Sequence, residues 1–224
     1  MKKLLISLAA LFVLCMSSAA KADTLTYTPT PTDLNDLDHH MVYTWKVSGV
    51  NLNGQQIAGA RITIKNIANW DSNANRLFIH LLDNAKFSGV ASFVDDPTGS
   101  TPVTDIRDDF VDTRYHNQSN WLVASGTADT YLTDRSFTMT PTNFVYNFTA
   151  AQVQALFTYI SNGGNFALGF DPDCHFFNDG ITFEIFTSTP ASVPEPATLT
   201  LLGTGLAGLY ARRRRQRQQA SRAA

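Results

Sequence analysis

Residues 171–180 hold the densest group of side chains that could do chemistry. Three carboxylates, an imidazole, a thiol and an amide fall within these ten positions. Carboxylate and amide oxygens are the ligands that calcium prefers, and the candidates here are Asp171, Asp173, Asn178 and Asp179. The spacing differs from that of an EF-hand, and a hairpin loop whose Asp and Asn side chains cap turns explains the same composition. The segment is therefore predicted to be an exposed hairpin loop, with calcium binding as the functional alternative.

Aromatic residues beside polar turns suggest a second chemistry, the binding of sugars. A flat aromatic ring can pack on the apolar face of a pyranose, while Asp and Asn side chains bind its hydroxyl groups. The candidate contacts are Trp70 with Asp71, in the polar segment 69–73, and Trp121. The alternative for each tryptophan is a role in the core or as the anchor of a loop.

Catalysis finds less support in the sequence. No Gly-x-Ser-x-Gly elbow, phosphate-binding loop or His-Glu-x-x-His motif occurs. Acid–base chemistry would need carboxylates that the fold brings together, such as Asp171 with one of Asp95, Asp96 or Asp109. We therefore expect no enzyme activity, and the alternative is a polysaccharide hydrolase or lyase that uses clustered Asp residues. The tandem His39 and His40 are expected to lie in a loop without a binding role.

The elements that must position these residues are mostly strands. Asp residues number 17 against two Glu, and Asp, Asn and Thr favour turns and strands over helix interiors. Apolar and polar residues alternate over 42–47, 61–67 and 136–140, which is typical of half-buried strands. Residues 77–82 are more continuously apolar and predict a central strand.

One helix is predicted after Thr149, which forms a capping box with Gln152. An apolar stripe at helical spacing follows, made of Val153, Leu156, Phe157 and Ile160. The pair of glycines at 163–164 ends this helix of about 12 residues. About nine short strands with one short helix predict an all-β fold, a β-sandwich of the jelly-roll kind, to which a single hydrophobic helix is added at the C-terminus.

The N-terminus has the three parts of an export signal. Lys2 and Lys3 precede an apolar stretch over residues 4–16, and small residues stand at Ala20 and Ala22. About 13 apolar residues are too few to span a bilayer, so we expect signal peptidase to cleave after Ala22. The mature chain then keeps one cysteine, Cys174, and cannot form an internal disulfide.

The C-terminus carries a second sorting pattern. Two prolines around one glutamate give a rigid extended segment, and an apolar, glycine-interrupted stretch over residues 197–211 and a basic cluster over 212–217 follow it. As a helix the apolar stretch spans about 22 Å, short of the ~30 Å hydrocarbon core of a bilayer. The basic cluster favours a cytoplasmic end and leaves the rest of the chain outside. The residues that carry the pattern are Pro194, Glu195, Pro196, Arg212, Arg213, Arg214 and Arg215.

In order and spacing, residues 193–215 closely resemble the PEP-CTERM sorting signal of Gram-negative bacteria, also known as the ice-binding protein C-terminal domain. The resemblance implies that exosortase, a membrane-embedded cysteine transpeptidase, recognises the tail while a transmembrane helix anchors it transiently in the inner membrane. Processing near the Pro-Glu-Pro sequence would then release the protein or transfer it to a surface acceptor. The resemblance also implies an association with exopolysaccharide and biofilm.

These signals divide the chain into four parts. They are a signal peptide (1–22), an extracellular β-sandwich domain (23–190), a sorting and anchor segment (191–217) and a cytoplasmic tail (218–224). Residues 23–192 contain 8 of the 17 Lys and Arg but 18 of the 19 Asp and Glu, which is a net charge of −10. Because this charge repels phosphate, no nucleic-acid partner is expected.

The expected function is that of a non-catalytic binding or structural module, secreted or held at the cell surface. The expected partners are signal peptidase, exosortase and extracellular polysaccharide. Calcium is the one cofactor that the sequence suggests.

Overall fold

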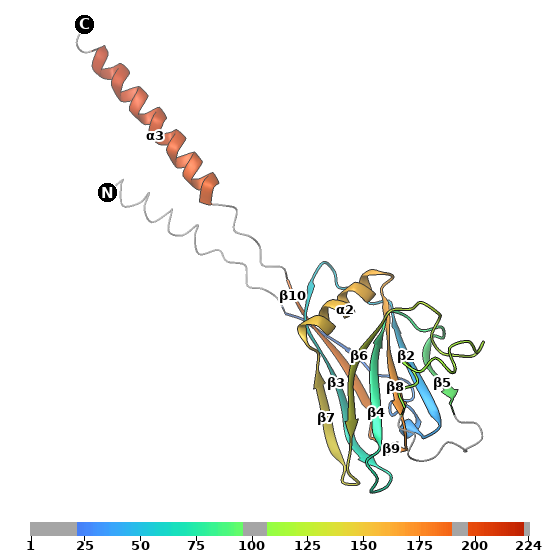
Figure 1. The fold of residues 1–224 in the computed structure, drawn as a ribbon. Helices are drawn as coiled ribbons and strands as arrows, with labels where there is room; N and C mark the ends of the chain where they lie inside the picture. Colours follow the sequence, from blue (N-terminus) through green and yellow to red (C-terminus); the bar gives the residue numbers. More distant parts are fainter. Residues whose placement is uncertain (1–21, 96–106, 190–196, 222–224) are drawn as a thin grey trace. The chain divides into compact units, whose positions relative to one another are not determined.

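The computed structural model describes residues 22–95, 107–189 and 197–221 (Figure 1). The strands are β1 (Thr24–Tyr27), β2 (Met41–Ser48), β3 (Gln56–Asn69), β4 (Arg76–Leu82), β5 (Gly89–Val94), β6 (Asp129–Ser136), β7 (Thr142–Asn147), β8 (Asn165–Pro172), β9 (Phe176–Phe177) and β10 (Ile181–Ser188). The helices are η1 (Asn35–Leu37, a 3-10 turn), α2 (Ala150–Ser161) and α3 (Ala197–Ala220).

The described strands form two antiparallel sheets. One has the order β1-β10-β3-β7, with β9 paired to the end of β3, and the other has the order β5-β2-β8-β4-β6. With β5 and β9 set aside, the strand order is β1-β10-β3-β7 against β2-β8-β4-β6, which is the double Greek key of a jelly roll. The predicted all-β sandwich is confirmed, and β5 extends the second sheet at its β2 edge.

The alternating segments form strands in most places where the sequence predicts them. Residues 42–47 and 61–67 lie inside β2 and β3, and the apolar segment 77–82 lies in β4, between β8 and β6. The predicted strand over 136–140 is wrong, because β6 ends at Ser136 and β7 begins at Thr142 in the opposite sheet. Only Phe137 of this segment packs against the core, while Met139 is exposed, and the segment crosses from one sheet to the other.

The main core lies between the two sheets and collects large side chains from both. Trp45, Ile62 and Phe166 are among its members. A second cluster contains Val42 and Leu82 from β2 and β4 and also Trp121, from the segment that follows residue 107. The β2-β8-β4 sheet is therefore buried on both faces, which explains why residues 77–82 read as continuously apolar.

Helix α2 lies across one end of the sandwich (Figure 1) and contacts β3 of one sheet and β6 and β8 of the other. Its predicted capping box is confirmed: the Gln152 N–H donates to Thr149 Oγ1, and the Thr149 N–H donates to Gln152 Oε1. Leu156, Tyr159 and Ile160 bury the apolar side of the helix in the main core. The helix thereby connects β7 to β8 and closes that end of the sandwich.

The segment 171–180 is not the simple hairpin loop that the sequence predicts. Its first two residues, Asp171 and Pro172, end β8 in one sheet, whereas β10 begins at Ile181 in the other. Between them Phe176 and Phe177 form β9 against the end of β3, and Phe176 is completely buried. The segment therefore crosses the sandwich and contributes to its core.

The chain divides into two compact units, and residues 21–189 form the one that contains the sandwich. All the residues of both buried clusters lie between 34 and 185. Because its core is self-contained, this unit can be studied as an isolated fragment.

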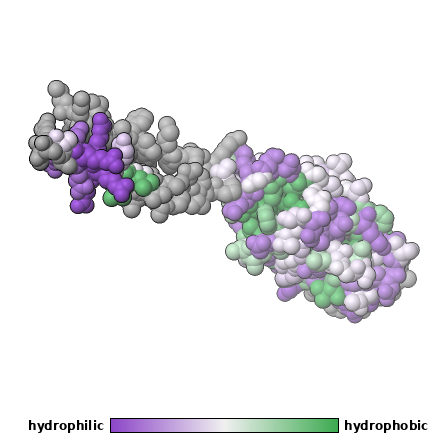
Figure 2. All heavy atoms as spheres, turned by 90° about the horizontal axis from the view of Figure 1, so that it is seen from above, coloured by the Kyte–Doolittle hydropathy of each residue, from purple (hydrophilic) through white to green (hydrophobic). Residues whose placement is uncertain are grey.

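Helix α3 belongs to the other unit. It runs to Ala220, whereas the sequence predicted a helix that ends at residue 211. The residues after 211 are mostly Arg, Gln and Ala, which are good helix formers. Hydrophilic side chains gather on α3, where residues 212–214 are exposed (Figure 2). Three predicted features lie outside the described parts of the chain: residues 1–21 of the signal peptide predicted over 1–22, the triad Pro194, Glu195 and Pro196, and the side chain of Arg215. Among the described helices, none combines the length and apolar character needed to cross a bilayer.

Candidate functional site

Trp70 is held out into solvent by a rigid polar loop. It follows the last residue of β3, and 60% of the residue is exposed. In the loop, Asp71 Oδ1 accepts hydrogen bonds from the Asn73 N–H (2.9 Å) and from Asn75 Nδ2 (2.8 Å). The buried Asn69 donates from Nδ2 to the Asn73 carbonyl at 2.8 Å and accepts from Asn75 Nδ2 at 3.0 Å. The Asn and Asp side chains thus fix the loop and leave the indole as its exposed tip.

A groove of about 660 Å³ adjoins this indole, and we call it the Trp70 groove. Phe177 of β9 and Met139 also line it, and they are 44% and 60% exposed. Polar groups lie beside these apolar side chains. They are contributed by Asp36, Asn66, Asn69, Asn178 and Asp179. Exposed flat rings next to acceptors and amides are the combination that carbohydrate recognition requires.

A bulge in β3 helps to place the polar side of the groove. The register of β3 against β7 shifts between Ile64 and Ile67, and Asn66 takes a left-handed backbone conformation with φ of 47°. Its side chain then donates to Asp179 Oδ2 at 2.6 Å. The nearby Asn178 donates from Nδ2 to the Asp33 carbonyl at 2.9 Å. These bonds join the segment after β9 to β3 and to the segment before η1.

The charge of the Trp70 groove is negative. Its described lining includes the carboxylates of Asp36 and Asp179 and no Lys or Arg. Such a surface repels anionic chains and suits neutral or cationic ones.

The three residues predicted to contact a sugar have different environments. Trp70 is on the surface, which is the environment that sugar contact needs. The carboxylate oxygens of Asp71 accept hydrogen bonds from the loop itself, where Oδ2 also accepts from Asn73 Nδ2 at 2.6 Å. Trp121 is 2% exposed, and its ring stacks with those of Tyr115 and His116 at centroid distances of 6.3 and 5.0 Å. Trp121 is therefore a core residue, and the proposal that it contacts a sugar is corrected.

Each of the four predicted calcium ligands has a partner of its own within the protein. Asp171 accepts from the Asp109 N–H at 2.6 Å, and Asp173 accepts from the Arg76 N–H. These bonds come in addition to those of Asn178 and Asp179 described above. The structure therefore joins the four side chains to separate parts of the fold, and calcium binding by the set stays a prediction.

Asp171 lies close to Asp95 and Asp109, two of the three carboxylates that the sequence analysis gave as its potential catalytic partners. Oxygens of Asp95, Asp109 and Asp171 all lie within 4.8 Å of one another, while Asp96 lies outside the described residues. Burial raises the pKa of Asp171 well above its ordinary value, and Asp109 raises it further. Burial and the neighbouring Asp95 also raise the pKa of Asp109 to about 7, although Arg114 donates to Asp109 Oδ1 at 3.2 Å and opposes the shift. The group can share protons or hold a hard cation.

A second buried polar group connects this region to the sheet. His80 of β4 is completely buried, and its ring nitrogens donate to Asp108 Oδ2 and Asp129 Oδ1, both at 2.9 Å. Burial lowers the pKa of His80, but the two carboxylates outweigh it and raise the pKa to about 9. The imidazolium therefore joins the segment after residue 107 to β4 and β6, which is a structural role. The side chain of Asp108 is 15% exposed.

The sequence did not indicate several residues of the groove. Phe177 lies in the segment 171–180, whose Asp and Asn side chains suggested a calcium site and gave no sign of an exposed aromatic surface. Asn66 stands in an alternating strand pattern that gives no sign of a bulge. Met139 falls in the segment wrongly predicted as a strand.

The comparison with known families concerns the other end of the chain. Residues 192–215 match the PEP-CTERM protein-sorting motif, which confirms the resemblance seen at 193–215. No curated protein matches the sequence. The motif indicates an exported protein that is directed to the cell surface, with exosortase as its processing partner.

Proposed function

We propose that this exosortase substrate is a non-catalytic module that binds a neutral polysaccharide of the extracellular matrix in the Trp70 groove. The observation that carries the proposal is the exposure of Trp70, at 60%, beside the 44% exposed Phe177. Large aromatic rings are normally buried, and exposed ones next to one another mark a binding surface. The loop hydrogen bonds around Asp71 keep the indole in place before a ligand arrives, so little conformational entropy is lost on binding.

The charge of the groove supports a neutral chain. Asp36 and Asp179 can accept hydrogen bonds from sugar hydroxyls, and the described lining offers no cation for a uronic acid or a sulfate. A polysaccharide of neutral hexoses presents apolar ring faces to the aromatic side chains and hydroxyls to the carboxylates.

The buried carboxylates favour binding over catalysis. Cleavage of a glycosidic bond by two carboxyl groups requires both to reach the substrate. Asp109 and Asp171 are only 4% and 1% exposed, and both hold bonds inside the protein. The alternative function, a hydrolase or lyase that uses clustered Asp residues, would need these groups to become accessible.

The tail supplies the location of this activity. In our proposal the apolar part of α3 anchors the protein transiently in the inner membrane of a Gram-negative cell until exosortase acts near the Pro-Glu-Pro sequence. The body then reaches the surface or the medium, where exopolysaccharide and biofilm provide its ligand. The acidic charge of the body is consistent with a partner other than nucleic acid.

A glycan array tests the proposal. The body, residues 23–190, should bind neutral glycans, and Trp70→Ala should reduce the affinity at least tenfold, which corresponds to about 1.4 kcal/mol. Phe87→Ala is the matched control, because Phe87 is 43% exposed and does not line the Trp70 groove. Equal binding by both variants, or cleavage of a glycan by the wild-type body, would contradict the proposal.

A further inference from the structure

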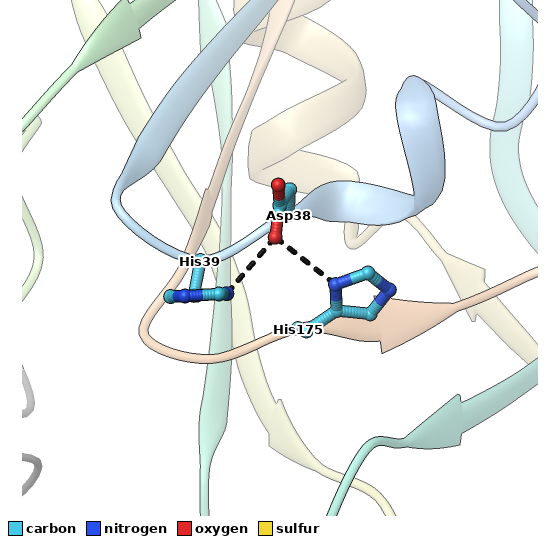
Figure 3. A group of neighbouring side chains, drawn as sticks. All are labelled: Asp38, His39 and His175. Carbon is cyan, nitrogen blue, oxygen red and sulfur yellow. Dashed lines mark hydrogen bonds and ion pairs between the residues drawn. The ribbon is translucent and has the colours of Figure 1, made fainter.

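Three potential metal ligands, Asp38, His39 and His175, point toward one another (Figure 3). Asp38 and His39 lie between η1 and β2, and His175 lies just before β9. The Nδ1 atoms of His39 and His175 approach the same oxygen, Asp38 Oδ1, at 2.9 and 3.0 Å. One ligand atom from each residue lies within 4.8 Å of the other two. Residues 136 positions apart in the sequence thus share one point in space.

The spacing of these atoms fits a small divalent cation. Bonds of about 2.0–2.2 Å to nitrogen and oxygen put adjacent ligand atoms of a metal roughly 3 Å apart. The two nitrogen–oxygen distances match that separation. Two imidazoles with one carboxylate are a ligand set that suits zinc and similar transition metals, whereas calcium prefers oxygen alone.

We propose that Asp38, His39 and His175 form a binding site for a divalent transition-metal ion of the zinc class. The site takes three ligands from the protein and leaves the remaining positions to water or to another ligand. It uses none of the four residues that the sequence suggested for calcium.

The fold holds two of the three ligands in place by bonds that do not involve the proposed metal. The Asp38 N–H donates to the hydroxyl of the buried Tyr43 at 3.0 Å. The carbonyl of His175 accepts from the Trp70 N–H at 3.0 Å, and the His175 ring lies 4.4 Å from that of Phe177. Positioned ligands lose little freedom when a metal arrives, and this favours binding.

One atom limits the affinity. Nε2 of His175 is buried and makes no hydrogen bond within the described residues. When Nδ1 binds a metal, Nε2 carries the proton, and metal-binding histidines normally donate that proton to an acceptor. The missing acceptor is therefore expected to weaken zinc binding by roughly 10–100-fold relative to a site whose histidines are all hydrogen-bonded.

The metal site goes beyond the proposed function and does not depend on it. It adjoins the groove, since the ring of Trp70 lies 6.3 Å from that of His175 and both Trp70 and Phe177 line the groove. Because a bound ion would cross-link the segment before β2 to the segment before β9, we expect it to stabilise the folded protein whether or not a sugar is present.

Isothermal titration with zinc chloride tests the site directly. The protein is the body, residues 23–190, without a polyhistidine tag and freed of metal by a chelator. We expect one zinc ion per chain and a rise in the thermal midpoint at saturating zinc. His39→Ala and Asp38→Asn should each weaken binding at least tenfold. Both side chains are about half exposed, at 50% and 48%, so these variants should fold.

His116→Ala is the matched control, since it removes an imidazole that belongs to the Trp121 cluster. This variant should bind zinc as the wild type does. The proposal is overturned if the wild type shows no saturable zinc binding, or if His39→Ala and Asp38→Asn bind zinc as tightly as the control.

Discussion

The buried His80 should make the sandwich lose stability as the pH rises above neutrality. A histidine whose pKa is higher in the folded than in the unfolded state binds its proton more tightly when folded. The stabilisation is then complete below the unfolded pKa and disappears as the pH rises through the folded pKa. For His80 these values are 6.5 and about 9. A tenfold difference in proton affinity is worth about 1.4 kcal/mol, so the loss amounts to about 3 kcal/mol at most.

Urea denaturation of the body at about pH 6 and pH 9 measures this loss. The wild type should be less stable at pH 9, because the neutral imidazole can no longer pair with both Asp108 and Asp129. His80→Gln should be less stable than the wild type at pH 6 and should lose less stability than the wild type between the two pH values, because only the buried carboxyl groups such as Asp109 still titrate there. His116→Gln is the control and should keep the wild-type dependence. If His80→Gln loses as much stability as the wild type over this range, the pairing of His80 with the carboxylates does not control it.

Three further perturbations address the other parts of the molecule. Burial raises the pKa of Asp109 to about 7, so the wild type should lose stability as the pH rises from about 4 to 7, and Asp109→Asn should reduce that slope in urea denaturation. Gly169→Ala should destabilise the body by about 1–3 kcal/mol, because the new Cβ would lie 2.5 Å from the Phe110 ring. Calorimetry measures this loss, and an unchanged thermal midpoint would refute the contact. Glu195→Ala, or deletion of residues 212–217, should leave unprocessed precursor in the inner membrane on fractionation, and normal release of both variants would contradict the role of the tail.

Local patterns were sufficient for much of the fold. The capping box at Thr149 and Gln152 predicted the start of α2, because both partners lie within one turn of helix. Alternation predicted β2 and β3, but it reports burial and not which sheet a segment joins. For that reason residues 136–140 and 171–180 were assigned to a strand and a hairpin, whereas both segments cross between the sheets.

The candidate site depended on contacts between distant residues, which a single sequence does not reveal. The polar neighbours of Trp70 left two environments open, surface and core, and the structure has the exposed one. The grouping of Asp171 with Asp95 and Asp109 was likewise among the pairings that the sequence left open. The burial of Trp121 could not be decided from the sequence, because the side chains around it come both from its own irregular segment and from distant strands, among them Phe93 of β5. His39 was assigned to an ordinary loop, because His175, which approaches the same Asp38 oxygen, is 136 positions away in the sequence.

Tryptophan fluorescence during a polysaccharide titration tests the central claim most directly. The other two tryptophans, Trp45 and Trp121, are 4% and 2% exposed, so a ligand that covers Trp70 should account for the spectral change. Addition of exopolysaccharide from the producing cells should shift the emission of the body to shorter wavelength and saturate, and Trp70→Phe should lose the shift. If the polysaccharide cosediments with the body but the emission stays unchanged, or if Trp70→Ala binds as tightly as the wild type, the ligand does not occupy the Trp70 groove.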